Sequence, residues 1–543
     1  MPIAMPHSID TVTGLIAARA AEAPRAPAVI ADEGRLDYAG LDALGRRAAT
    51  GLAALGVAAG SRVAFWLPNS LAYLGLYLGC CRLGATAVAV NTRYRSAEVG
   101  DIVHRSGATV LVLWPGFRGI DFLGLLEGCD PAALAGIRHV VTVDPFGQGG
   151  PARLPGHLDH AARADWHDLA GATAMAPGDV RDRAAADAGC NIFTTSGTTR
   201  APKFVLHNQA SIAGHAQTAA TAFGYPGRRG GFMCVLPFCG VFGFNQVMAA
   251  LAAGRPAVIR SAFDTAEVVA LMDAHGVTDF NGTDDMLGAL MDTQGGPAAM
   301  ARPPFIGWAA WGTEYERLGR RADAAGIRFC GLFGMSEIQA LFSARPASDP
   351  VERRLKPGGT LASPVTEIRV RDPDSGAVLG MNAPGELEVR GPSLMAGYAD
   401  DPAATAAAFT ADGWFRTGDL ALLDGPRSLL FLQRMGDVLR LGGFLVSPAE
   451  IEAQLQAGPG IAAAQVVGVP GPEGTRPVGF VTLADGAGFD EAALQAHCRA
   501  QLARFKVPVR IFALDDFPRA MSPNGMKIQR AALRRMAEEA LQG

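Results

Sequence analysis

A loop rich in hydroxyl side chains is the part of this sequence best suited to chemistry. It follows an apolar run at residues 191–193 and reads Thr194-Thr195-Ser196-Gly197-Thr198-Thr199-Arg200-Ala201-Pro202-Lys203. A loop that leaves a buried strand can fold its N–H and O–H donors around phosphate oxygens, and a lysine adds positive charge. The loop lacks the Gly-Lys-Ser/Thr ending of a Walker motif. We therefore predict a phosphate-binding loop of another kind, with a Ser/Thr-rich surface loop as the alternative.

The elements around this loop alternate between helix and strand. Helical patterns and short apolar runs follow one another at residues 41–55, 63–67, 71–83, 87–90, 97–105 and 110–113. This alternation is typical of an α/β fold with largely parallel sheets. Beyond about residue 385 short strands dominate, and Gly442-Gly443 separates two apolar runs as a hairpin turn does. We place a domain boundary near residues 434–437.

Composition argues against several classes of protein. The chain has 543 residues, 49% hydrophobic and 18% charged, so it is long and apolar enough for at least two packed domains. Its net charge is −4 and it has no long Lys/Arg run, which argues against nucleic acid as a partner. The longest apolar stretch, residues 71–81, is too short to span a bilayer. Eight cysteines without a C-x-x-C pair are typical of core thiols in a reducing cytoplasm.

The hydroxyl-rich loop and four later motifs together resemble those of the adenylate-forming enzymes. This superfamily includes acyl-CoA synthetases, luciferases and the adenylation domains of peptide synthetases. In chain order the later motifs are Phe333-Gly334-Met335-Ser336-Glu337, Phe415-Arg416-Thr417-Gly418-Asp419-Leu420, the segment 434–452, and Pro518 with Lys527-Ile528-Gln529-Arg530. The resemblance covers nearly the whole chain and is closest to the acyl-CoA synthetases. It implies a large N-terminal α/β domain with two packed sheets, residues 1–434, and a small mobile C-terminal α+β domain, residues 435–543.

The resemblance also implies a reaction in two steps. A carboxylate attacks the α-phosphorus of ATP to give acyl-AMP and pyrophosphate, and a thiol, usually that of coenzyme A, then displaces AMP. Both steps build negative charge on oxygens, so the site needs hydrogen-bond donors, a lysine and Mg²⁺. The expected cofactors are ATP and Mg²⁺, with coenzyme A as co-substrate.

In such enzymes the nucleotide is held by the motifs just described. By resemblance, the β- and γ-phosphates are bound by Thr195, Ser196, Gly197, Thr198, Thr199 and Lys203. Arg200 stands where the family usually has glycine, and it either adds a phosphate contact or points to solvent. Phe333 would stack on adenine, Ser336 would touch the α-phosphate, and Glu337 would hold Mg²⁺. The alternative for Glu337 is a solvated loop acid.

The ribose and adenine contacts are expected from other strands. Asp419 matches the acid that binds both ribose hydroxyls, and Arg434 matches an arginine that also reaches the ribose. A surface salt bridge is the alternative for each. Gly312 and Thr313 lie where the family places its adenine-side strand, although the family usually has a double glycine there.

The small domain is expected to bring in a catalytic lysine and the acceptor tunnel. Lys527 matches the lysine that bridges the carboxylate and the α-phosphate, although Met526 stands between glycine and lysine where the family usually has no residue. Lys506 is the competing lysine, which we interpret as structural or as a contact to a CoA phosphate. Gly436 falls at the hinge, where glycine tolerates a large rotation. Gly442 and Gly443 would line the pantetheine tunnel.

The residues expected to select the acyl group are mostly apolar. By resemblance they are Phe238, Cys239, Gly240, Val241, Phe242, Asn245, Phe280, Trp308 and Gly334, the last of which lets the backbone approach the acyl group. An uncharged chain or ring is therefore expected. His207 matches a common family histidine, and an ordinary structural role explains it equally well.

We predict an ATP-dependent acyl-CoA ligase for an apolar or aromatic carboxylic acid, acting in the cytoplasm as a monomer or homodimer. The alternative is a ligase that passes the acyl group of acyl-AMP to an amine or amino acid. A non-catalytic homologue would be expected to have lost Glu337, Asp419 or Lys527, and all three are present.

Overall fold

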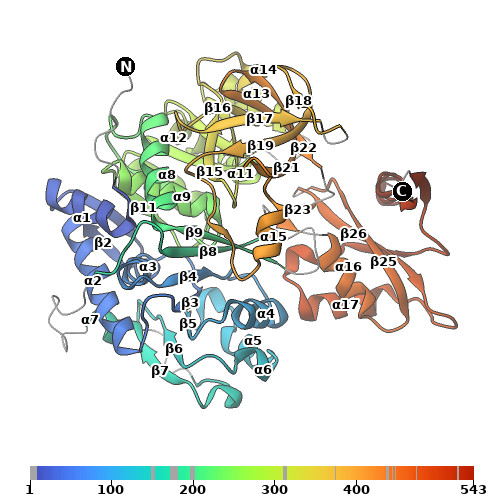
Figure 1. Ribbon diagram of the computed structural model, residues 1–543, viewed down its shortest axis with the longest axis horizontal. Helices are drawn as coiled ribbons and strands as arrows, with labels where there is room; N and C mark the ends of the chain where they lie inside the picture. Colours follow the sequence, from blue (N-terminus) through green and yellow to red (C-terminus); the bar gives the residue numbers. More distant parts are fainter. Residues whose placement is uncertain are drawn as a thin grey trace.

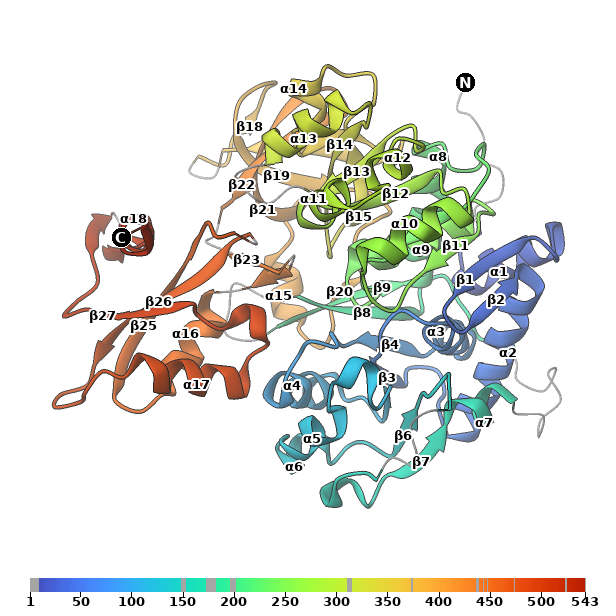
Figure 2. The ribbon, with the colours of Figure 1, turned by 180° about the vertical axis from the view of Figure 1, so that it is seen from behind.

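The chain forms a large N-terminal unit and a smaller C-terminal unit, at the left and right of Figure 1. The last helix, α18 (Arg530–Gln542), lies on the side of the small unit that faces away from the large unit (Figures 1 and 2). This computed structural model describes residues 9–147, 153–171, 182–195, 202–309, 315–372, 375–435, 439–442, 444–446, 448–472, 474–522 and 525–542.

The longer sheet of the large unit changes from parallel to antiparallel pairing at β14. Within the described residues its strands lie in the order β18 (Val378–Leu379), β17 (Glu367–Arg371), β19 (Gly385–Arg390), β21 (Phe415–Gly425), β22 (Ser428–Arg434), β16 (Gly358–Leu361), β15 (Gln339–Ala344), β14 (Phe329–Met335), β13 (Ile306–Ala309), β12 (Asp279–Thr283), β10 (Phe232–Cys234), β11 (Ala257–Ile259), β1 (Pro27–Ala31) and β2 (Gly34–Asp37). Neighbours from β14 to β1 pair in parallel, and neighbours from β14 to β18 pair antiparallel. The motif at residues 333–337 therefore lies where the direction of the sheet changes.

The second sheet carries the strands on either side of the hydroxyl-rich loop. In the described chain its order is β20 (Gly397–Tyr398), β9 (Lys203–Asn208), β8 (Gly189–Thr195), β4 (Thr86–Ala89), β3 (Arg62–Trp66), β5 (Val110–Leu113), β6 (His139–Thr142) and β7 (Ala162–Asp165). The strands from β8 to β7 are parallel, whereas β9 pairs antiparallel with both of its neighbours, β8 and β20. These two sheets confirm the predicted α/β class of the large unit.

Helices cover the sheets and fill the space between them. Those of the large unit are α1 (Val12–Glu22), α2 (Tyr38–Ala54), α3 (Leu71–Leu83), α4 (Ser96–Ser106), α5 (Phe122–Glu127), α6 (Pro131–Leu134), α7 (Trp166–Gly171), α8 (Gln209–Ala222), α9 (Val241–Ala252), α10 (Thr265–Ala274), α11 (Asp284–Asp292), α12 (Gly296–Met300), α13 (Tyr315–Ala324), α14 (Val351–Arg354) and α15 (Pro402–Ala407). Helix α9 reaches both sheets, because Phe244 packs 5.6 Å from Phe193 of β8 and Asn245 hydrogen-bonds to β15. No described helix combines the length and apolarity needed to cross a membrane.

The small unit has its own apolar core. Its elements are β23 (Leu439–Leu441), β24 (Phe444–Val446), α16 (Pro448–Gln456), β25 (Ile461–Val469), β26 (Arg476–Leu483), α17 (Glu491–Gln501), the 3₁₀ turn η3 (Arg504–Lys506), β27 (Arg510–Ala513), β28 (Arg519–Ser522), β29 (Gly525–Ile528) and α18. Leu441, Val446 and Ile451 are fully buried in this core. The predicted hairpin around residues 442–443 is present as the β23–β24 pair.

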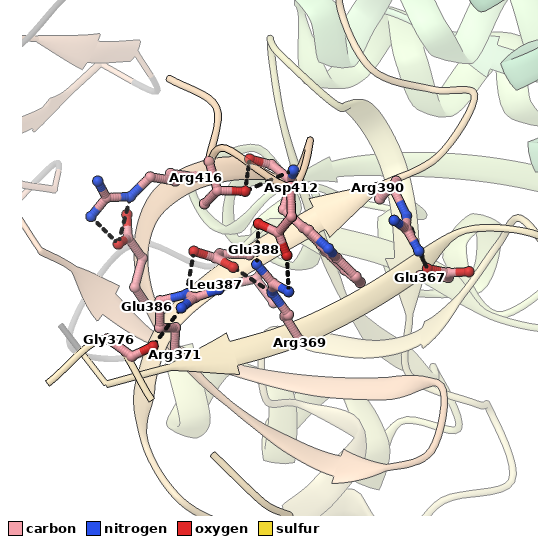
Figure 3. Close-up of polar contacts among 12 residues, drawn as sticks. Glu367, Arg369, Arg371, Gly376, Glu386, Leu387, Glu388, Arg390, Asp412 and Arg416 are labelled. Atoms are coloured by element: carbon pink, nitrogen blue, oxygen red, sulfur yellow. Dashed lines mark hydrogen bonds and ion pairs between the residues drawn. The ribbon is translucent and has the colours of Figure 1, made fainter. Parts of the chain in front are cut away.

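A network of ion pairs braces the strands that lead to Asp419 (Figure 3). Glu388 of β19 is completely buried and accepts hydrogen bonds from Arg369 at 2.5 Å and from Arg371 at 2.9 Å. On the next strand Arg416 donates to Glu386 at 2.8 Å. Because the buried carboxylate has two cationic partners, its charge is compensated and the β17–β19–β21 pairing is held in register.

All eight cysteines are buried and none is in a disulfide, as expected for core thiols.

Candidate active site

The motif at residues 333–337 forms the turn between β14 and β15. Phe333, at the start of the motif, is 8% exposed, and its ring lies 5.6 Å from that of Phe431 on β22. The register shifts between Phe333 and Met335, and Ser336 and Glu337 follow in the turn itself. An ideal Cβ on Gly334 would lie 2.6 Å from the carbonyl oxygen of Gln339, so the tight approach of the two strands requires glycine here.

Two residues just after this turn have a backbone that only glycine adopts easily. Gln339 has φ 68° and Leu341 has φ 60°, both in the left-handed region. Such backbone persists where its surroundings over-determine it, and it clusters at functional sites. Here the buried amide of Asn245 provides the constraint: its Nδ2 donates to Gln339 Oε1 at 2.9 Å, and its Oδ1 accepts from Ala340 N at 2.8 Å. Asn245, predicted to contact the acyl group, therefore holds the active-site turn in place.

Two buried histidines fasten the same turn to the second sheet and to α8. His207 Nε2 lies 2.7 Å from the carbonyl oxygen of Ser336, and His215 Nε2 lies 2.6 Å from that of Ala340. Burial lowers the pKa of each histidine to about 4, so both rings are neutral at pH 7. Each ring can then donate from Nε2 to the carbonyl and accept at Nδ1 from a serine hydroxyl. For His207 this geometry favours the structural role.

Tyr398 connects the predicted magnesium ligand to the predicted phosphate lysine. Its hydroxyl donates to Glu337 Oε1 at 3.0 Å, and Lys203 Nζ lies 3.5 Å from the same hydroxyl and 4.6 Å from the ring centroid. Lys203 opens β9 directly opposite Thr195 at the end of β8. The loop between these two strands therefore leaves the sheet beside Lys203, although residues 196–201 lie outside the described chain.

Glu337 is suited to Mg²⁺ that arrives with a nucleotide. The residue is 7% exposed, and among the described residues no cluster of three or more His, Cys, Asp or Glu side chains could hold a metal alone. Mg²⁺ commonly uses one or two carboxylates and takes its remaining ligands from phosphate oxygens and water. A single carboxylate beside the lysine predicted to bind phosphate fits that pattern, and the bound ion would neutralise phosphate charge.

Asp419 is fixed on β21 by hydrogen bonds within its own strand and to the neighbouring strand β19. The residue is 3% exposed, its N–H donates to Thr417 Oγ1 at 3.1 Å, and the Thr417 hydroxyl donates to the carbonyl oxygen of Leu387 at 2.7 Å. Gly418 between them has φ 68°, a conformation that favours glycine. Arg434 pairs with Asp419 across the β21–β22 ladder, which places the two predicted ribose residues side by side.

The predicted acyl residues fall into two groups. Phe238, Phe280 and Trp308 are at most 1% exposed, and Trp308 packs against Phe329 in a core formed with helices α10 to α13. This placement favours a core role for Trp308 and Phe280. Gly240, Val241 and Phe242 at the start of α9 are half-buried, as is Gly334.

The remaining predicted residues fall wholly or partly outside the described chain. Ser196, Gly197, Thr198, Thr199, Gly312, Thr313, Gly436 and Gly443 lie outside the described residues, as do the side chains of Thr195, Arg434 and Lys527. The backbone of Lys527 pairs with Ala520 in the β28–β29 hairpin. Gln529 alone separates that hairpin from α18, which lies on the outer side of the small unit (Figure 2). The lysine hairpin thus leads directly into the helix on the side of the small unit that faces away from the large unit.

Sequence reasoning missed Tyr398, His215 and Gln339 as parts of this site. Their roles depend on contacts across 61, 125 and 94 positions of the chain. The pair Gly397-Tyr398 matches the family pattern and was the one available signal for Tyr398.

Comparison with known families agrees with this geometry. The family model of the AMP-binding enzymes matches residues 16–399, and that of the AMP-binding enzyme C-terminal domain matches residues 450–523. The chain belongs to the AMP-binding enzymes. Within that superfamily it stands closest to the acyl-CoA synthetases and is an AMP-forming acid–thiol ligase, for which ATP, Mg²⁺ and coenzyme A are the expected small molecules.

Two relatives match almost the whole of this AMP-binding enzyme. The 3-[(3aS,4S,7aS)-7a-methyl-1,5-dioxo-octahydro-1H-inden-4-yl]propanoyl:CoA ligase of Mycobacterium tuberculosis is 33% identical, over 95% of this chain and 97% of the relative. The 4-coumarate–CoA ligase 5 of Oryza sativa subsp. japonica is 31% identical, over 92% of this chain and 89% of the relative.

Solved structures share the fold of this AMP-binding enzyme. An amide bond synthetase from Marinactinospora thermotolerans is 25% identical with a TM-score of 0.79, covering 96% of this chain and 99% of the other. The o-succinylbenzoate CoA synthetase of Bacillus subtilis, 24% identical, gives a TM-score of 0.78 as a double mutant bound to a product analogue, over 96% and 98% of the two chains. The same synthetase in complex with AMP gives 0.63, over the same shares.

The Tyr398 bridge gives a first prediction. Tyr398→Phe keeps the ring over Lys203 but removes the hydroxyl that orients Glu337, so acyl-AMP formation should slow about tenfold, or ~1.4 kcal/mol. Substrate-dependent pyrophosphate exchange measures this step. Tyr38→Phe is the matched control, since its hydroxyl donates to backbone carbonyls far from the site. Equal rates of pyrophosphate exchange in both variants would contradict a role for the Tyr398 hydroxyl in orienting Glu337.

Proposed function

We propose that this enzyme converts an apolar or aromatic carboxylic acid into its coenzyme A thioester through an acyl-AMP intermediate. The observation that carries the proposal is the alignment of Lys203, Tyr398 and Glu337 beside the end of β8. A cation and a metal-binding carboxylate joined through one hydroxyl suit the triphosphate of ATP.

The residues divide the chemistry as follows. The substrate carboxylate attacks the α-phosphorus, and the bond to pyrophosphate breaks. Lys203 stabilises the charge on the departing pyrophosphate, while Asp419 orients the ribose. In the second step the sulfur of coenzyme A attacks the acyl carbon, and AMP leaves as the carbon–oxygen bond breaks.

The preference for an apolar acid rests on the start of α9. Residues 238–242 read Phe-Cys-Gly-Val-Phe and contain no charged side chain. Burial raises the pKa of Cys239 to about 12, so this thiol stays neutral at pH 7. Such a lining suits a hydrocarbon chain or ring. The names of the two relatives, an indenylpropanoyl and a coumarate ligase, are consistent with ring-bearing acids.

Transfer to an amine is the second candidate. The likeness in fold to an amide bond synthetase supports it, and the described residues of the nucleotide site suit either acceptor. A cytoplasmic location, favoured by eight buried free thiols, and a monomeric or homodimeric state complete the proposal.

A panel of carboxylic acids tests the proposal. AMP release is measured for each acid with coenzyme A and, separately, with primary amines. Release that depends on coenzyme A and is fastest with aromatic or aliphatic monoacids supports the proposal. Release with an amine but not with coenzyme A would favour the second candidate, and preference for a dicarboxylic acid would contradict the apolar pocket.

A further inference from the structure

A buried cluster of charges joins the two units of the enzyme. Lys506 of η3 donates from Nζ to Glu450 of α16 at 2.6 Å, within the small unit, and also to Glu98 of α4 in the large unit. The side chains of Lys506 and Glu98 are 5% and 9% exposed. We call Glu98, Lys506 and Glu450 the interdomain clamp. None of its members is required by the nucleotide chemistry described above.

The clamp depends on the present orientation of the small unit. Glu98 Oε2 accepts from the backbone N–H of Ala503 at 3.2 Å, in addition to the contact that Lys506 makes with Oε1. It also accepts from Arg95 N at 3.0 Å, which satisfies a backbone donor at the start of α4. If the small unit turned away, Lys506 would keep its hydrogen bond to Glu450, and Glu98 would keep its hydrogen bond from Arg95. The contacts of Glu98 with Ala503 and Lys506, together with the stacking of Lys506 over the Tyr94 ring at 4.7 Å, therefore distinguish the two orientations.

The charges in the clamp are desolvated but compensated. Burial lowers the pKa of Lys506, but Tyr94, Glu98 and Glu450 outweigh this effect and hold that pKa above its usual value. Burial raises the pKa of Glu98, which the ammonium of Lys506 opposes. An interaction between desolvated charges is stronger than one at the surface, and removing one partner leaves the other uncompensated.

The clamp lies next to the glycine hairpin of the small unit. A Cβ on Gly442 would be 3.1 Å from Cβ of Phe505, the residue that precedes Lys506. Gly442 has φ 57°, so glycine is favoured at this contact. Strand β23 lies on the side of the small unit that faces the large unit, and α18 lies on the opposite side (Figures 1 and 2). The orientation that the clamp stabilises thus presents the hairpin of Gly442 to the large unit, whereas the helix that follows the Lys527 hairpin lies on the opposite side.

We propose that Glu98 is a positioning residue for the thioester-forming step, because it stabilises the small unit in the orientation that presents the Gly442 hairpin to the acyl-AMP. The inference rests on the proposed transfer to coenzyme A. An interaction that is present in one orientation of the small unit and absent from the other shifts the equilibrium between the two orientations by the full free energy of that interaction. Loss of the clamp should therefore slow the second half-reaction and leave the first unchanged or faster.

Glu98→Gln tests this inference in single-turnover experiments. Glutamine keeps an oxygen for Arg95 and Ala503 but removes the charge that faces Lys506, so the cap of α4 survives. Conversion of preformed acyl-AMP to thioester should slow about tenfold, while substrate-dependent pyrophosphate exchange stays at or above the wild-type rate. Asp101→Asn is the matched control. It also removes a negative charge from α4, but the Asp101 carboxylate pairs with Arg105 of the same helix and makes no contact of the clamp. It should change neither step.

A second variant separates the clamp from a general loss of stability. In a Lys506→Met background, Glu98→Gln should cause little further slowing of the thioester step, because the pair is already broken. Thermal unfolding of each variant identifies any that is misfolded. Equal slowing of both half-reactions would overturn the proposed role of the clamp. So would effects of the two substitutions on the thioester-forming step that are fully additive.

Failure of the proposed function would look different. A wild type that forms no thioester would contradict transfer to coenzyme A, whatever the variants do. The ratio of the two half-reactions in Glu98→Gln, measured with whichever acceptor the wild type uses, would then still decide the role of the clamp.

Discussion

Lys527→Ala is expected to slow acyl-AMP formation by about 10²–10³-fold, or ~3–4 kcal/mol, as for the loss of one transition-state donor. The proposed role of Lys527 is to bridge the carboxylate and the α-phosphate when the small unit closes in the other orientation. In the present orientation its hairpin lies next to the outward-facing α18. Conversion of supplied acyl-AMP to thioester should therefore suffer far less. Pyrophosphate exchange and single-turnover thioester formation measure the two steps separately.

Lys506→Met is the natural comparison for this variant. Lys506 is buried between Glu98 and Glu450, so its loss should affect the second step rather than the first. If Lys506 proves more important than Lys527 for adenylation, the alignment of the catalytic lysine across Met526 is wrong. Equal losses in both steps for Lys527→Ala would contradict the division of labour between the two orientations.

Gly443→Trp is expected to abolish thioester formation while acyl-AMP formation continues. The proposed pantetheine tunnel passes the β23–β24 turn, and an indole there would block the thiol sterically. The nucleotide site is built on the large unit, so pyrophosphate exchange should persist. Gly443 is preferred to Gly442 for this test, because a side chain on Gly442 would meet Phe505 and a strained backbone.

The hairpin itself could fail to fold in this variant. Circular dichroism and retained exchange are therefore necessary controls, and Gly443→Ala provides a smaller side chain at the same position. Full turnover with coenzyme A in Gly443→Trp would contradict the tunnel.

Local signals made much of the secondary structure predictable. Helix α3 spans the predicted residues 71–83, because Ser70 caps its first turn and Gly84, with φ 69°, ends it. Strand β5 likewise coincides with the predicted apolar run at residues 110–113. Motif order then identified the superfamily and with it the two-sheet architecture.

Side-chain direction was less predictable than the elements themselves. Strand β13 is buried along its whole length, so its sequence gives no alternation to tell which face Trp308 occupies. Trp308 packs in the core beside α10 to α13. Asn245 likewise follows the predicted acyl residues along α9, yet its amide binds β15. Both outcomes depend on tertiary packing.

The supports of the active-site turn are also products of tertiary structure. Tyr398 belongs to a two-residue strand, too short to leave a periodic pattern, and it meets Glu337 because β20 pairs with β9. Glu98 matches an ordinary capping glutamate in sequence. Its contact with Lys506 joins positions 408 residues apart and becomes visible in the folded chain.

One measurement tests the central claim most directly. Enzyme, MgATP and an aromatic acid that supports turnover are mixed without coenzyme A, quenched within one turnover, and analysed by mass spectrometry before and after coenzyme A is added. We expect acyl-AMP with an equal amount of pyrophosphate first, and the acyl-CoA thioester with AMP after the addition. Formation of ADP and phosphate, or an acyl-AMP that coenzyme A leaves unchanged, would contradict the account.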